Sequence, residues 1–149
     1  MIILGDDMKK GVLVIIVGML FCLTGCSEKK LVCTSTGKDL GKEVKTKVVV
    51  KFDNKEASKV EETIDMTFEE EYRSSIDSIY KALEEQYKLY DGKSGIKVVS
   101  TKGDDNINVK INIDVKAQKD AENAVNVIDT AGTRSDIKKS LETEGYTCK

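Results

Sequence analysis

The sequence predicts an α+β domain, in which an antiparallel sheet of about five strands carries a long helix and C-terminal helices packed on one face. Three observations support this prediction. Several segments alternate apolar and polar residues with the period of a strand, a central stretch has the apolar spacing of a helix, and turn residues separate neighbouring segments. No repeat or domain boundary interrupts residues 31–149, so we expect a single domain there.

Three strands are expected first. Residues 31–36 form a short strand candidate that ends at Gly37. Residues 44–52 alternate apolar side chains with lysines, which is typical of a strand with one solvated face. The tripeptide at 53–55 has the composition of a turn, and residues 60–68 continue the alternation. The last two strands therefore form a β-hairpin.

A helix is expected next, from about residue 67 to about residue 90. Thr67-x-x-Glu70 has the pattern of a capping box, and Asp91-Gly92 supplies an end signal. Apolar residues at spacings of three and four form one stripe, which includes four of the five tyrosines: Tyr72, Tyr80, Tyr87 and Tyr90. Packing against the sheet is the favoured interpretation of this stripe, and a tyrosine-lined ligand groove is the alternative.

Two more strands and the C-terminal elements follow. Residues 96–100 and 107–115 alternate around a turn at 103–106, and residues 120–128 suit a weak helix. Thr133-x-x-Asp136 has the pattern of a cap for a last helix that carries Ile137 and Leu141. The chain then returns to the sheet through residues 146–148.

The first 25 residues have the architecture of a signal peptide. Lys9-Lys10 precede an apolar run at 12–23, which is too short for a comfortable membrane span. Asp6 and Asp7 fit such a segment poorly, so we expect translation to start at Met8. Residues 26–30 are then a short tether before the domain.

The end of the apolar run resembles the bacterial lipobox, with Leu23, Thr24, Gly25 and Cys26 in succession. This resemblance implies that a peptidase recognises Leu23, Thr24 and Gly25 and cuts before Cys26, whose sulfur carries a diacylglyceryl group. The lipid bilayer is then a partner of the chain through acylated Cys26. We expect a lipid-anchored protein on the extracytoplasmic face of the cell membrane. A single-pass helix with an incidental cysteine is the alternative.

The remaining cysteines predict a disulfide. Cys22 lies in the discarded segment and Cys26 takes the lipid, which leaves Cys33 and Cys148 as an even pair in a protein expected to leave the cytosol. A bond between them would close a loop of more than 100 residues. Two unpaired thiols are the alternative.

The composition excludes several chemistries. The chain contains no histidine, so it cannot build a histidine-dependent nucleophile system or a histidine-ligated metal site. Its net charge of −2 gives no indication of nucleic-acid binding. Gly92-Lys93-Ser94 and Asp104-Asp105-Asn106 are interpreted as turns, since neither has the context of a phosphate-binding or calcium-binding loop. We expect no catalytic residue, no metal and no cofactor.

The solvated face of the predicted sheet is the candidate binding surface. It would present Lys45, Lys47, Lys51, Asn108, Lys110 and Asn112. If no helix covers this face, it can dock a protein or an anionic wall polymer. Solvated, ion-paired strands are the alternative interpretation.

The arrangement as a whole resembles the YehR-like small bacterial lipoproteins, a domain-of-unknown-function family. The resemblance rests on the lipobox, the lysine-rich hairpin, the helix after Thr67, the alternating strand at 107–115 and the terminal Glu144-Gly145-Tyr146. It implies a fold and a membrane location, and it transfers no catalytic residue. We therefore expect non-enzymatic binding of a protein or envelope component near the membrane. The alternative is a small ligand-binding or hydrolytic protein that uses the tyrosine-lined helix face.

Overall fold

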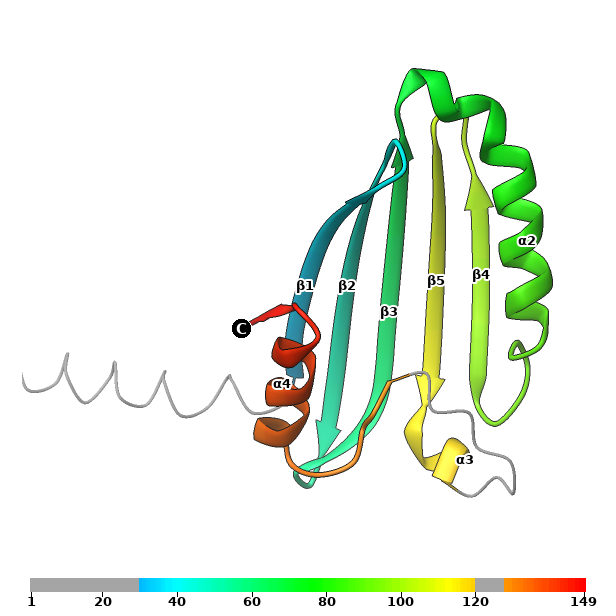
Figure 1. Cartoon of the computed structure of the whole chain (residues 1–149). Helices are drawn as coiled ribbons and strands as arrows, with labels where there is room; N and C mark the ends of the chain where they lie inside the picture. Colours follow the sequence, from blue (N-terminus) through cyan, green and yellow to red (C-terminus); the bar gives the residue numbers. More distant parts are fainter. Residues whose placement is uncertain (1–29, 120–127) are drawn as a thin grey trace, which may run out of the picture.

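The computed structural model describes residues 30–119 and 128–149 (Figure 1). The predicted signal segment, the lipobox with Cys26 and nearly all of the weak helix expected at 120–128 lie outside the described residues. Among the helices that the structure describes, none has the length and apolar character needed to cross a membrane.

A six-stranded antiparallel sheet forms the body of the domain, in the order β4-β5-β3-β2-β1-β6. The α+β architecture agrees with the prediction, and the strand count is six rather than about five because residues 147–148 pair with the first strand. The strands are β1 (Lys30–Asp39), β2 (Lys42–Asp53), β3 (Glu56–Phe68), β4 (Ile96–Lys102), β5 (Asn106–Asp114) and β6 (Thr147–Cys148).

Long hairpins build the first three strands. β1 does not end at Gly37 as expected, because Gly37 pairs with Val44 and the ladder runs on to Asp39 and Lys42. The β2–β3 hairpin turns where it was predicted, through Asn54 and Lys55, which both have positive φ. Two positive φ values in a two-residue loop suit the right-handed twist of the flanking strands.

The central helix is shorter than predicted. α2 (Ile76–Lys88) has 13 residues and follows the 3₁₀ helix η1 (Glu70–Ser75). The capping box expected at Thr67 is wrong, because Thr67 still pairs with Glu43 and Asn106 in the sheet. Ladder hydrogen bonds on both sides of β3, together with the burial of Phe68, extend the strand through the position where the local pattern indicated a helix start.

Two further helices follow β5. α3 (Val115–Lys119) begins where the sequence predicted the last strand residue, and the Asp114 carboxylate accepts a hydrogen bond from the Ala117 backbone N–H at its first turn. α4 (Arg134–Thr143) confirms the predicted terminal helix. Thr133 and Asp136 form its capping box, with the Thr133 backbone N–H donating to the Asp136 carboxylate at 2.8 Å.

The helices and the inward-facing strand residues share one core. α2 runs along the β4 edge and α4 lies over β1 (Figure 1). Both helices contribute to this core, through Ile76 on α2 and through Ile137 and Leu141 on α4. Ten inward strand residues are fully or nearly fully buried: Leu31, Cys33, Val48, Val50, Val60, Ile96, Ile107, Val109, Ile111 and Ile113. Because side chains alternate along a strand, the opposite face of the sheet carries the intervening polar residues.

Candidate binding surface

The polar face of the sheet brings together all six residues of the predicted binding surface. In the strand register, Lys45 lies in line with Asp65 and Asn108, whereas Lys47 lies in line with Thr63 and Lys110. Asn112 and Lys51 belong to the next two rows on the same face, with Asn112 opposite Glu61 and Lys51 opposite Lys59. The placement follows from period-two alternation, since every one of these residues flanks inward apolar positions. Their function in binding remains a prediction.

Three neighbouring cross-strand rows of this face are rich in lysine, and they are called the lysine rows below. They are Thr34–Lys47–Thr63–Lys110–Val99, Val32–Val49–Glu61–Asn112–Lys97 and Lys30–Lys51–Lys59–Asp114. Six lysines stand against two carboxylates in these rows, a net charge of +4. The whole chain has a net charge of −2, so everything outside the lysine rows sums to −6. The surface is therefore a basic region on an acidic protein.

Ion pairs with carboxylates neutralise only part of the positive charge of the lysine rows. The Lys51 ammonium lies 2.5 Å from the Glu61 carboxylate, and both side chains are about half exposed. Lys47, Lys59, Lys97 and Lys110 have no ion pair among the residues that the structure describes. Lys30 likewise has no ion pair to the described residues, so five of the six ammonium groups of the lysine rows remain available to an anionic partner.

The rest of the polar face is balanced in charge. In the two rows beyond Lys47, two lysines stand against two carboxylates. Lys45 and Glu43 form an ion pair at 2.7 Å, in which hydrogen bonding and charge lower the pKa of Glu43 and raise the pKa of Lys45. Asp65 accepts a hydrogen bond from the Asn108 side chain. The basic character is confined to the lysine rows, close to the start of β1.

An open hollow of about 230 Å³ lies at the same end of the polar face. Its lining includes the ammonium-bearing Lys59 and Lys97 and the amide of Asn112. The other residues around it are Val60, Glu61, Gly95, Ile113 and Asp114. Lys59 and Lys97 were absent from the predicted surface, although Lys97 stands between Ile96 and Val98 and Lys59 precedes the inward Val60, so both could have been assigned to it.

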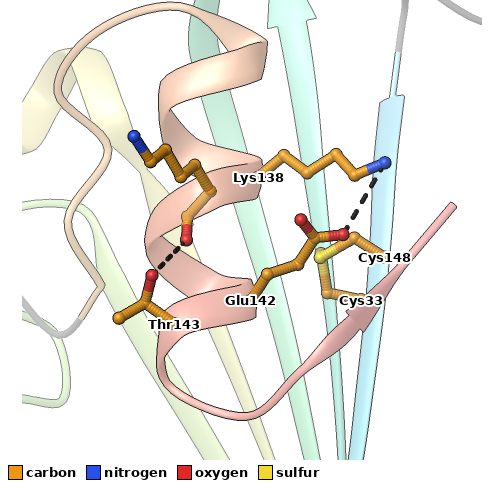
Figure 2. The surroundings of a disulfide bond; sticks show 6 residues. Cys33, Lys138, Glu142, Thr143 and Cys148 are labelled. Atoms are coloured by element: carbon orange, nitrogen blue, oxygen red, sulfur yellow. Dashed lines mark hydrogen bonds and ion pairs between the residues drawn. A yellow bond between two sulfur atoms is a disulfide. The ribbon is translucent and has the colours of Figure 1, made fainter.

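The predicted disulfide is confirmed. Cys33 on β1 and Cys148 on β6 are bonded, and they lie directly opposite each other in the antiparallel register. Val32 and Lys149 extend the pairing through two backbone hydrogen bonds of 3.2 and 2.9 Å. Figure 2 shows the bond beside α4, where Lys138 and Glu142 form an exposed ion pair at 3.7 Å. The disulfide therefore joins the C-terminus of the domain to the strand that follows the predicted tether.

The core face holds a carboxylate that the sequence interpretation missed. Glu62 lies opposite Val48 and Ile111, in the middle of the inward side of the sheet. Burial raises the pKa of the Glu62 carboxyl above its ordinary value. The sequence signal was its position between the inward residues Val60 and Ile64, where alternation predicts an apolar side chain.

The charge of Glu62 acts on two tyrosines that other elements bring to the core. Burial and, second, the Glu62 charge raise the pKa of Tyr87 on α2. The same two causes raise the pKa of Tyr146, and hydrogen bonding with Ser35 and Thr46 partly opposes the rise. Tyr80, in contrast, packs on the core and donates to the Ser100 carbonyl at 3.3 Å, as expected for a structural tyrosine. The tyrosine stripe is thus mainly part of the core.

Among the described residues, no group of three or more cysteine, aspartate or glutamate side chains is placed to hold a metal ion. The cysteines in the described ranges form the disulfide, and most carboxylates there are exposed on helix or strand exteriors.

Comparison with known proteins shows a similarity of fold to solved structures. No protein-family model and no curated protein matches the chain. The NMR structure of the Escherichia coli YehR protein is similar, with a TM-score of 0.53 and 18% identity, over 82% of this chain and 92% of that one. An NMR structure of a protein from Streptococcus pneumoniae TIGR4 aligns at a TM-score of 0.45 and 15% identity, over 83% and 87% of the two chains. The chain has a YehR-like fold, in agreement with the resemblance of the sequence.

Proposed function

We propose that the chain is a bacterial lipoprotein, anchored through acylated Cys26, that binds an envelope component or protein near the membrane through the polar face of its sheet. Anchoring is supported by the lipobox at residues 23–26 and by the basic and apolar segments before it. Two or three acyl chains hold a protein firmly at a bilayer, because each buried methylene contributes about 0.8 kcal/mol. The domain then works on the extracytoplasmic side of the membrane.

The observation that carries the binding proposal is the strand register. It gathers the predicted lysine and asparagine side chains on one face, away from the helices that contribute to the core. Lysine and amide side chains form ion pairs and hydrogen bonds with a partner. Among the described residues of this face, no hydroxyl or thiol nucleophile stands in a hydrogen bond with a base, so binding is favoured over catalysis.

Site-specific photo-crosslinking in intact cells tests this proposal. A benzophenone amino acid replaces Asn112, which is exposed on the polar face, and a matched control replaces Lys81, which is exposed on α2. We expect a discrete crosslinked species from position 112 that is absent from position 81. Identical products from both positions would contradict the proposal, because they would reflect random encounters along the membrane.

A second candidate function is favoured by Glu62. A half-buried carboxylate whose charge acts on two phenol groups, on the core face that also carries Ile64 and Met66, suits a small ligand that carries a positive charge on an apolar body. A thermal-shift screen of amines tests this candidate. A stabilising amine should lose its effect in Glu62→Gln and keep it in Glu61→Gln, since Glu61 lies on the opposite face. Equal stabilisation of both variants would contradict a site at Glu62.

A further inference from the structure

We propose that the envelope component bound by the lysine rows is the anionic phospholipid headgroup layer of the bilayer in which Cys26 is anchored. The domain then lies with this part of its polar face against the membrane. The inference rests on the proposed function, because it requires an acylated Cys26. It adds the chemical class of the partner and the orientation of the domain.

The short tether places the lysine rows within reach of the headgroups. β1 begins at Lys30, only four residues after Cys26, and an extended chain of four residues spans at most about 14 Å. Lys30 is itself a member of the row that contains Lys51 and Lys59. Neighbouring rows are about 7 Å apart along a strand, so the row of Lys47 lies roughly 14 Å from that of Lys30. The greatest reach of the tether is therefore comparable with the length of the basic surface along the strands, roughly 14 Å in each case.

The charge distribution favours one orientation at an anionic surface. The lysine rows carry +4 and the remainder of the chain −6, so a negative bilayer attracts the rows and repels most other surfaces. The attraction acts within a Debye length, about 8 Å at physiological ionic strength. Each lysine held that close strengthens docking by about fivefold.

The hollow at the edge of the lysine rows is the proposed binding site for a headgroup phosphate. Lys59 and Lys97 supply two ammonium groups without ion pairs, and Asn112 supplies an amide donor. The two carboxylates that line the hollow are already engaged. Glu61 pairs with Lys51, and Asp114 accepts from the Ala117 backbone N–H at 3.1 Å. A phosphate in the hollow would therefore meet the donors of Lys59, Lys97 and Asn112, while the two neighbouring carboxylates already interact with other groups of the protein.

The position of the basic rows favours lipid over a wall polymer or a protein. The basic charge begins where the tether joins the sheet and stops after the row of Lys47. Beyond that row, Lys45 is compensated by Glu43 and the face has no net charge. A surface that binds a polymer extending away from the membrane is expected to stay basic beyond that row. A surface that docks on the bilayer needs basic charge only near the anchor.

Lysine footprinting of the full lipidated protein tests the inference. The protein is reconstituted in vesicles of phosphatidylcholine alone or of phosphatidylcholine with phosphatidylglycerol, lipids without reactive amines. Acetylation rates are then read for each lysine by mass spectrometry. We expect Lys47, Lys97 and Lys110 to react several-fold more slowly on the anionic vesicles, and high salt to abolish the difference. Lys81 and Lys88, exposed on α2, are internal controls and should react equally on both.

Two double variants that remove the same charge provide a matched control. Lys47→Gln with Lys110→Gln removes two unpaired ammonium groups, whereas Lys81→Gln with Lys88→Gln removes two from the exposed side of α2. The first pair should weaken docking by about thirtyfold, seen as lost protection of Lys97, and the second should leave it unchanged.

Each other outcome overturns the inference in a distinguishable way. Equal acetylation on both vesicle types, with protein that floats with the vesicles, contradicts lipid docking and leaves the anchor intact. Protection in isolated cell envelopes but not on anionic vesicles identifies a protein or wall polymer as the partner. Protein that lacks acyl chains and fails to float with either vesicle contradicts the proposed function together with the inference.

Discussion

Removal of the Cys33–Cys148 disulfide is expected to be the most destabilising single change in the domain. The bond joins residues 115 apart in the sequence, and the β6 strand that it holds is only two residues long. Without the bond, the pairing of β6 with β1 relies on a few backbone hydrogen bonds near the C-terminus. The cross-link therefore lowers the conformational entropy of the unfolded chain, and it also holds β6 in place beside β1.

The magnitude follows from the loop that the bond closes. For a closed loop of this length, the chain-entropy relation gives about 4.8 kcal/mol at 25 °C, and measured values fall within about 2–5 kcal/mol. A domain of this size has a total stability of roughly 5–15 kcal/mol. Loss of the bond is thus expected to remove a large share of the free energy of unfolding.

Urea denaturation of the lipidated protein in detergent, followed by far-ultraviolet circular dichroism, measures this loss. Three samples are compared: the oxidised protein, the same protein reduced, and Cys33→Ala with Cys148→Ala. The reduced protein keeps both sulfur atoms, so it separates the cross-link from the packing of the buried Cys33 side chain. A loss below about 1 kcal/mol on reduction would refute the reasoning, because the cross-link would then not constrain the unfolded chain.

Three further predictions concern single residues. Because burial raises the folded-state pKa of Glu62, the free energy of unfolding should fall as the pH rises above about 4.5. In urea titrations, Glu62→Gln should therefore be more stable than the unchanged protein at pH 7 and not at pH 4. The exposed Glu85→Gln is the control and should show no such gain at pH 7. Thr133→Val removes the hydroxyl that accepts from the Asp136 backbone N–H at the start of α4 and should cost about 1 kcal/mol by thermal unfolding. No loss would show that this half of the cap is dispensable. Gly41→Ala should cost about 1–3 kcal/mol, because Gly41 has positive φ and an added Cβ meets the Tyr72 ring, whereas Gly37→Ala meets no atom within 4 Å and should be nearly neutral; equal losses would contradict this.

Period-two alternation made most of the sheet predictable from the sequence. Each strand buries one side, so an apolar residue at every second position determines which side chains face the core. That is why Lys47 and Lys110, from strands far apart in the sequence, could be assigned to one surface. The cysteine pair was predictable for a different reason, since two of the four cysteines already had roles in the expected signal and anchor.

Features that depend on tertiary context were not predictable. Thr67-x-x-Glu70 has a local capping pattern, but pairing of Thr67 on both sides of β3 outweighs it. The setting of Glu62 likewise depends on distant elements, because its charge acts on Tyr87 of α2 and on Tyr146 of the segment after α4. Nothing in the sequence around Glu62 indicates that these distant elements meet on the core face.

Mass spectrometry of the N-terminal peptide from the membrane fraction tests the central claim most directly. The account predicts a mature protein that begins at Cys26, with a diacylglyceryl group on the Cys26 sulfur. A peptide that crosses the bond between Gly25 and Cys26 in the mature protein, or an N-terminal Cys26 with a free thiol, would contradict the lipid anchor.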